Sequence, residues 1–178
     1  MPDAERPRQD AAVLVPLFRG RDGEVRLVIV RRAEGGLHGG QLAFPGGKPE
    51  PEDASMLDTA IREAEEEIGL ARDAVEVLSA LPVLETRTTG FRIAPFLARI
   101  RRPAHWRPAA GEIAEVLEVK LADLLRPDAH DEVVEQFPTW SGPMKIAFYH
   151  VGPYRLWGAS YRIFHPLLPR LAAGEWTV

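Results

Sequence analysis

The chain has 178 residues, 46% of them hydrophobic, so it can bury one core of ordinary size without disulfide or metal staples. Its 22 basic and 26 acidic side chains give a formal net charge of -4. Proteins that bind nucleic acid favour a strongly basic surface, so this charge argues against a nucleic-acid partner. The absence of Cys excludes disulfides, thiol nucleophiles and Cys-ligated metal sites, and it fits a cytoplasmic location.

The first predicted elements are a tail and a strand hairpin. Residues 1–9 are polar and proline-broken, so we expect a flexible tail followed by a single domain over residues 10–178. Apolar stretches at residues 11–18 and 25–30 flank a polar turn that ends in Asp22-Gly23, a pattern typical of two antiparallel strands. Apolar runs stay short of the roughly 20 residues that span a bilayer, so no membrane partner is expected.

A glycine-rich loop and a helix come next. Residues 31–40 (RRAEGGLHGG) lack periodicity, and Phe44-Pro45-Gly46-Gly47 predicts a tight backbone turn. Residues 53–68 predict a helix, because apolar side chains recur at spacings of four, three and four residues, at Leu57, Ile61, Ala64 and Ile68. We expect Asp53 to be the N-cap of this helix and Gly69 its C′ residue.

The remainder of the chain combines strands with short helices. Strands are predicted at residues 75–81, 91–100, 113–119 and 144–150, and a short helix at residues 121–125. A closing helix is expected over residues 160–173, where Pro166 and Pro169 must lie near its start or break it. The fold class is therefore α/β, with helices packed against a mixed sheet.

The predicted helix carries a cluster of acidic side chains. At about 100° per residue, Glu63, Glu66 and Glu67 fall within an arc of roughly 100°, at the border of the apolar stripe. Like charges at these spacings repel by about 0.2–0.5 kcal/mol per pair, and Arg62 alone does not neutralise them. A solvated face is the ordinary explanation of such a cluster. Here a Gly-Gly turn and a basic loop precede it, which favours a Mg²⁺ or Mn²⁺ site facing phosphate oxygens.

Residues 47–70 resemble the signature motif of the Nudix hydrolase family. The second half of that motif is matched in full by nine residues, Arg62-Glu63-Ala64-Glu65-Glu66-Glu67-Ile68-Gly69-Leu70. The first half departs from it, since Arg62 lies fifteen positions after Gly47 instead of fourteen, and Asp53 or Glu52 replaces the upstream acid. We interpret this difference as one extra residue in the loop before the helix.

The resemblance implies an α/β/α sandwich and metal-dependent hydrolysis of a pyrophosphate bond in a small nucleoside-diphosphate-linked substrate. By position, Glu63, Glu66 and Glu67 would be catalytic metal ligands, and one of them would double as the base that activates water. The carbonyl of Gly46 would be a further ligand of the Mg²⁺ or Mn²⁺ ion, and Arg62 would orient the carboxylates. Relatives often form dimers, so a homodimer is expected as well.

Residues 28–47 (VIVRRAEGGLHGGQLAFPGG) resemble the additional motif that precedes the signature in coenzyme A pyrophosphatases. Similarity extends to residues 88–91 with Pro95, to residues 112–121 and to residues 156–159. The loop has Gly36-Leu37-His38 where the subgroup carries a second basic residue, and it is one residue short. The implied reaction converts coenzyme A and water into 3′,5′-ADP and 4′-phosphopantetheine.

The same resemblance implies a set of substrate contacts. Arg31 and Arg32 would face the phosphates beside Gly46 and Gly47, although surface arginines at a strand end are common. An additional acid would come from either Glu112 or Glu115, and the sequence does not choose between them.

Two rival functions are considered. One is an ADP-ribose or other dinucleoside-type pyrophosphatase, because the signature specifies the diphosphate chemistry and leaves the attached groups to the loops. The other is a catalytically silent nucleotide-binding sensor. The presence of Arg62 and all three motif glutamates argues against the sensor.

Overall fold

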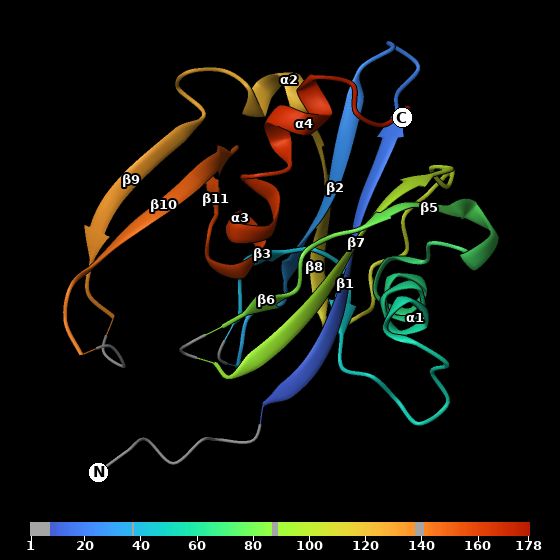
Figure 1. Cartoon of the computed structure of the whole chain (residues 1–178), viewed down its shortest axis with the longest axis horizontal. Helices are drawn as coiled ribbons and strands as arrows, with labels where there is room; N and C mark the ends of the chain where they lie inside the picture. The colour runs from blue at the N-terminus through green and yellow to red at the C-terminus, as the bar shows by residue number, and fades with distance from the viewer. Residues whose placement is uncertain (1–7, 37, 87–88, 138–140) are drawn as a thin grey trace.

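The structure is a computed structural model that describes residues 8–36, 38–86, 89–137 and 141–178 (Figure 1). Residues 1–7 of the predicted tail lie outside the described residues, as do Leu37 and Thr88 of the segments with family resemblance. The strands are β1 (Gln9–Arg19), β2 (Val25–Arg32), β3 (Leu42–Ala43), β4 (Gly46–Gly47), β5 (Val75–Ala80), β6 (Leu84–Glu85), β7 (Phe91–Ile100), β8 (Ile113–Lys120), β9 (His130–Glu135), β10 (Met144–Val151) and β11 (Tyr154–Leu156). The helices are α1 (Met56–Ile68), the 3₁₀ turn η1 (Arg72–Ala74), α2 (Leu121–Leu124), α3 (Gly158–Phe164) and α4 (Leu168–Ala172).

The main sheet is mixed and is built around β1. Its strand order is β3-β2-β1-β7-β5, with β4 added to β1, β6 to β7 and β8 to β2. β1 and β7 run parallel, in a register that pairs Gln9 with Phe91, whereas β1 and β2 form the antiparallel hairpin that the sequence predicts. A second sheet, with the order β11-β10-β9, contains only antiparallel pairs in the part of the chain described.

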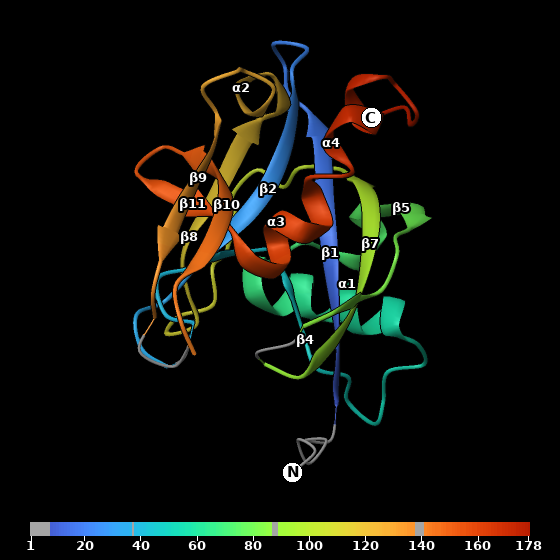
Figure 2. The same cartoon turned by 60° about the vertical axis from the view of Figure 1, so that its left-hand side comes forward.

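Both faces of the main sheet are covered. Successive side chains of β1 point to opposite faces, and apolar side chains on each face pack into a core. Leu14 and Phe18 join the core beneath α1, whereas Val15 and Leu17 join the core beneath α3 and α4. Figure 2 shows α1 on one side of β1 and β7, and the C-terminal helices with the second sheet on the other. The α/β class is confirmed, and the second outer layer contains a small sheet as well as helices.

Several sequence predictions are confirmed with small shifts in their boundaries. β7 has the predicted bounds, and β5, β8, β10 and α2 match the predicted elements to within one residue at each end. β1 begins at Gln9, so the last residue of the expected tail belongs to the strand. The closing helix is broken into α3 and α4 around Pro166, as a proline without an N–H group requires.

The predicted N-cap of the long helix is wrong. α1 begins at Met56, and its N-cap is Ser55, whose side-chain oxygen accepts a hydrogen bond of 3.1 Å from the N–H of Asp58. Asp53 lies two residues earlier, and its carboxylate has a different partner, described below. The predicted end is confirmed, since Gly69 adopts a left-handed conformation with φ of 71° and donates its N–H to Glu65.

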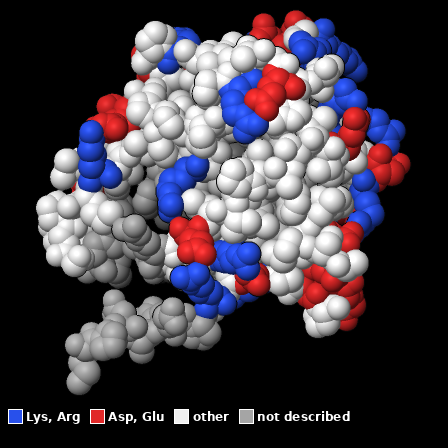
Figure 3. All heavy atoms as spheres, viewed as in Figure 1, with Lys and Arg blue, Asp and Glu red and all other residues white. Residues whose placement is uncertain are grey.

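No helix among the described residues is long and apolar enough to cross a bilayer. On the face drawn in Figure 3, basic and acidic side chains are intermixed around a broad uncharged area.

Candidate active site

The predicted Gly-Gly turn is a short strand that brings backbone against the first half of β1. In β4, Gly46 pairs with Val13 and Gly47 with Ala12. A Cβ atom on Gly46 would lie 2.2 Å from the carbonyl oxygen of Ala12, and one on Gly47 would lie 2.3 Å from Oε1 of Glu63. At position 46 only glycine fits without moving backbone, whereas a side chain at position 47 would displace the Glu63 carboxylate. The two glycines therefore place the β4 backbone directly beside the acidic face of α1.

Arg62 fixes that acidic face from one side. Its Nε and Nη2 atoms donate to the two carboxylate oxygens of Asp53 at 2.9 and 3.0 Å, and Nη2 also donates to the carbonyl of Lys48 at 3.0 Å. Its Nη1 atom donates to Glu63 at 3.2 Å and to Glu66 at 3.1 Å. One guanidinium thus joins the loop before α1 to two of the motif glutamates.

Of the two candidates for the upstream acid, Asp53 is the one that Arg62 contacts. Its side chain is 6% exposed, and it also accepts hydrogen bonds of 2.8 Å from the N–H of Glu50 and from the hydroxyl of Thr59. The hydrogen bonds from Arg62 hold the pKa of the Asp53 carboxyl well below its usual range. Glu52, the other candidate, is exposed and has no hydrogen bond or ion pair with any described residue. Asp53 thus ties the loop before α1 to the helix, and Glu52 does not.

Glu67 and Glu63 form the buried part of the acidic face. Glu67 is 5% exposed, and its carboxylate accepts a hydrogen bond of 3.1 Å from the N–H of Gly46. Burial raises the pKa of Glu67 to about 7, and burial likewise raises the pKa of Glu63. Glu66 is more accessible, with 56% of its side chain exposed, and its described contact is with Arg62. Arg62 thus meets Glu63 and Glu66, while Glu67 lies deeper against β4.

The chemistry of these donors fits a hard divalent cation. Carboxylate and carbonyl oxygens are the ligands that Mg²⁺ and Mn²⁺ prefer. The raised pKa values, caused mainly by burial, show that the charged carboxylates are disfavoured here, which a bound cation would offset. Within the described ranges, no three His, Asp or Glu side chains already surround a single metal-sized point. Glu63 and Glu67, with the carbonyl of Gly46, could hold such an ion, and Glu66 could join them by releasing Arg62.

Arg31 and Arg32 separate at the end of β2. Burial raises the pKa of Glu67, and the charge of Arg32 opposes that rise to a smaller extent, so Arg32 lies on the side of the acidic face. The guanidinium of Arg31 instead lies 5.2 Å from the ring centre of Tyr154, with its Nε 3.4 Å from Glu115. The register against β8 shifts between these two arginines. The structure brings Arg32 to the carboxylates and places Arg31 against the second sheet.

The same division distinguishes Glu112 from Glu115. Burial is the largest cause of the raised pKa values of Glu63 and Glu67, and the negative charge of Glu112 makes a smaller contribution in the same direction. Glu115 accepts a hydrogen bond of 3.2 Å from the hydroxyl of Tyr154 and one from Arg31. Of the two candidates, Glu112 is therefore the acid whose charge acts on the carboxylate cluster, and Glu115 belongs to the contact between the two sheets.

Tyr154 is the residue near this site that sequence reasoning missed. It lies in β11, a strand of three residues that carries no recognisable apolar pattern, and it meets Arg31 only because the second sheet folds back. His38 has a local contact instead, with its Nδ1 atom 3.2 Å from the side-chain oxygen of Gln41.

Several known proteins are similar to this chain. A family model described as NUDIX domain matches residues 7–140. Over 120 residues, the chain is 39% identical to a protein named uncharacterized Nudix hydrolase NudL from Citrobacter koseri, and the match covers 67% of this chain and 61% of that protein. A protein of the same name from Enterobacter sp. (strain 638) is 32% identical over 160 residues, covering 90% of this chain and 81% of that protein. The first match thus spans about three fifths of the relative's length.

Solved structures share the fold. A Nudix hydrolase from M. smegmatis, RenU, superposes with a TM-score of 0.65 at 18% identity, covering 97% of this chain and 91% of that chain. The NUDIX domain of Shewanella oneidensis NrtR, solved in complex with ADP ribose, superposes with a TM-score of 0.55 at 20% identity, covering 70% of this chain and 80% of that chain.

Proposed function

Because the chain belongs to the Nudix hydrolase family, we propose that it is a metal-dependent enzyme that hydrolyses the pyrophosphate bond of a small nucleoside-diphosphate-linked substrate. The observation that carries the proposal is the placement of Glu63 and Glu67 against the glycine backbone of β4, with Arg62 and Asp53 fixing the helix from the other side. This arrangement concentrates oxygen ligands where a diphosphate can approach the β4 backbone closely.

In this proposal, the acidic cluster, Gly46 and Arg32 each have a role. Glu63, Glu66 and Glu67 hold Mg²⁺ or Mn²⁺, together with the carbonyl of Gly46, and Arg32 attracts a phosphate. When bound, the cation neutralises the diphosphate oxygens and lowers the pKa of the attacking water. One of the cluster acids, or Glu112 beside them, accepts the proton of that water.

For the substrate, we propose coenzyme A or a derivative, cleaved to 3′,5′-ADP and 4′-phosphopantetheine. Support comes from residues 28–47, whose resemblance to coenzyme A pyrophosphatases covers β2, the glycine-rich loop and β4. ADP-ribose is the second candidate, because the NrtR domain was solved with ADP ribose bound. A cytoplasmic location and a homodimer remain predictions, and the mass of the purified protein in solution tests the dimer.

The test incubates purified protein with coenzyme A, ADP-ribose or NADH in the presence of Mg²⁺ or Mn²⁺ and identifies products by mass. Release of 4′-phosphopantetheine supports the full proposal. Cleavage of only ADP-ribose or NADH keeps the hydrolase and replaces the substrate. Glu67→Gln should abolish turnover, whereas Glu65→Gln, on the exposed side of the same helix, is the matched control. Nucleotide binding without cleavage under every condition would favour the sensor.

A further inference from the structure

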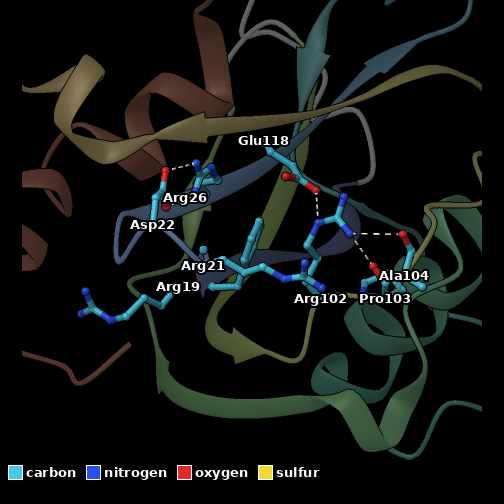
Figure 4. Close-up of a pocket in the computed structure, with 10 residues that line it drawn as sticks. Arg19, Arg21, Asp22, Arg26, Arg102, Pro103, Ala104 and Glu118 are labelled. Atoms are coloured by element: carbon cyan, nitrogen blue, oxygen red, sulfur yellow. Dashed lines mark hydrogen bonds and ion pairs between the residues drawn. The ribbon is translucent and has the colours of Figure 1, made fainter.

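A cavity of about 590 Å³ lies far from the carboxylate cluster, at the end of the hairpin formed by β1 and β2 (Figure 4). It is bounded by the turn after β1, by the start of β2, by the loop after β7 and by β8. Gly46 pairs with Val13, whereas the cavity begins at Phe18 and Arg19, so at 3.3 Å per residue the two sites are separated by roughly 20 Å along β1. None of the proposed catalytic residues lines it.

The lining of this cavity carries a local excess of positive charge in a chain whose net charge is -4. Its charged side chains are four arginines and two acids: Arg19, Arg21, Arg26, Arg102, Asp22 and Glu118. Both acids are already engaged. Asp22 pairs with Arg26 at 2.6 Å and with Lys120 at 3.5 Å, and Glu118 accepts hydrogen bonds from Arg102 at 2.5 Å and from the indole N–H of Trp106 at 2.7 Å.

Two arginines retain donors that can meet a ligand. Arg21 is exposed and has no hydrogen bond or ion pair with any residue that the structure describes. Arg102 uses Nε for Glu118 and Nη1 for the carbonyls of Pro103 and Ala104, which leaves Nη2 without a partner among the described residues. Arg19 extends away from the other labelled side chains in Figure 4, toward the backbone oxygens of Gly23 and Val178.

Gly20 makes room for the pair of Arg26 and Asp22 in the cavity lining. A Cβ atom at this position would lie 1.8 Å from Nη1 of Arg26 and 2.7 Å from Oδ1 of Asp22. The missing side chain therefore lets the Arg26 guanidinium lie across the backbone while it pairs with Asp22. Because the obstructing atoms are the far ends of side chains, an alanine here would displace Arg26 without blocking the backbone.

We propose that this cavity is a second binding site, specific for a small phosphoryl anion and separate from the carboxylate cluster. Guanidinium groups match phosphate oxygens with paired, charge-assisted hydrogen bonds, and Arg21 and Arg102 have donors free to form them. Arg26 adds positive potential from a fixed position. Phe18, Pro103 and Ala104 supply an apolar wall against which an attached organic group can pack.

The experiment titrates the full chain with inorganic pyrophosphate in EDTA and follows backbone amide shifts by NMR. Without divalent cations the carboxylate cluster repels the anion, so binding there is suppressed. We expect saturable shifts at residues 19–22 and 102–104 and none at residues 46–47. Shifts confined to residues 46–47, or no saturable shifts, would overturn the proposal.

Variants then assign the contacts. Arg21→Gln should weaken pyrophosphate binding about tenfold, the loss expected from a charge-assisted hydrogen bond. It removes no hydrogen bond or ion pair with the residues that the structure describes. Gly20→Ala should weaken binding as well. Arg101→Gln is the matched control, because Arg101 is exposed, lies beside Arg102 in sequence and pairs with Asp73 instead. Equal weakening by Arg101→Gln and Arg21→Gln would reduce the effect to general surface charge and refute a specific site.

Discussion

At the scale of single residues, the acidic face of α1 depends on the pairing of Arg62 with Asp53. The guanidinium binds both oxygens of Asp53 and still reaches Glu63 and Glu66. An arginine held at two points cannot swing away, so the carboxylates that it touches keep their positions.

Asp53→Asn should therefore lower kcat/KM by about 100-fold, the effect of a small misplacement of reacting groups. The amide keeps the shape of Asp53 and removes its charge, so Arg62 loses its strongest partner. Steady-state kinetics with saturating Mg²⁺ measures this change. Glu52→Gln, one residue away and exposed, should leave kcat/KM unchanged, and comparable losses in the two variants would contradict the assignment of Asp53 as the upstream acid.

The same pair makes stability depend on acid pH. The pKa of Asp53 is lowered in the folded protein, so its contribution to stability is fully present above the unfolded value of about 3.9 and is lost as pH falls toward the folded value. Urea unfolding at pH 7, 5 and 3 should thus show that wild type exceeds Asp53→Asn in stability at pH 7 and 5, with the gap narrowing at pH 3. A gap that widens in acid would refute the pairing.

Alanine substitutions at the two glycines of β4 should have different effects on stability and activity. Gly46→Ala presses a methyl group into the backbone of Ala12, so the free energy of unfolding should fall by about 1–3 kcal/mol. Gly47→Ala presses on the movable carboxylate of Glu63, so activity should fall while stability changes less. Thermal unfolding and kcat/KM, measured on both variants, separate the two effects. Identical behaviour of the two variants would argue against Gly47 as the residue that makes room for Glu63.

At the scale of elements, long periodic segments were predictable and short ones were not. β7 and the end of α1 follow from apolar spacing and a terminal glycine within one stretch of sequence. β4 and β11 have two and three residues, too few for any period. β4 exists because the distant β1 supplies hydrogen bonds, and β11 because the chain turns back onto β10. Tyr154 escaped prediction for that reason.

The start of α1 shows a different kind of error, in which the residue type was suitable for a cap but the side chain binds another partner. Asp53 has the chemistry of an N-cap, but Ser55 caps the helix while Arg62, nine residues later, binds Asp53. The motif glutamates were identified from their spacing on the helix, whereas the choice between Glu112 and Glu115 required the path of β8 and the position of the second sheet.

β11 is expected to influence substrate binding through Tyr154, because Tyr154 holds Arg31, the neighbour in β2 of the proposed phosphate ligand Arg32. Tyr154→Ala removes the ring that Arg31 covers and the hydroxyl bonded to Glu115, so KM should rise by about two- to tenfold with a smaller change in kcat. Tyr154→Phe keeps the ring, so its KM should lie between the KM of Tyr154→Ala and that of wild type. Steady-state kinetics provides the test, and an unchanged KM in Tyr154→Ala would remove β11 from the substrate site.

At the scale of the whole molecule, one sheet supports two differently charged sites. The acidic cluster lies where β4 meets β1, and the arginine-lined cavity lies beyond the other end of β1. A divalent cation is expected to bind only the first. Mg²⁺ or Mn²⁺ should raise the melting temperature by mass action, equivalent to about 2.7 kcal/mol at a concentration of 100 Kd.

Calorimetry with and without metal measures this stabilisation. Glu67→Gln should largely lose it, and Glu65→Gln should retain it. Stabilisation that survives in Glu67→Gln would place the metal elsewhere.

The parallel pairing of β1 with β7 also has a consequence for how the chain is made. Gln9 finds its partner Phe91 only 82 positions later, a distance that takes several seconds at a synthesis rate of roughly 5–20 residues per second. During that interval the strand with the most buried residues in the folded protein has one open edge. A ribosome that stalls before residue 91 would thus release an aggregation-prone chain, and folding in the cell should depend on holdase chaperones at this stage.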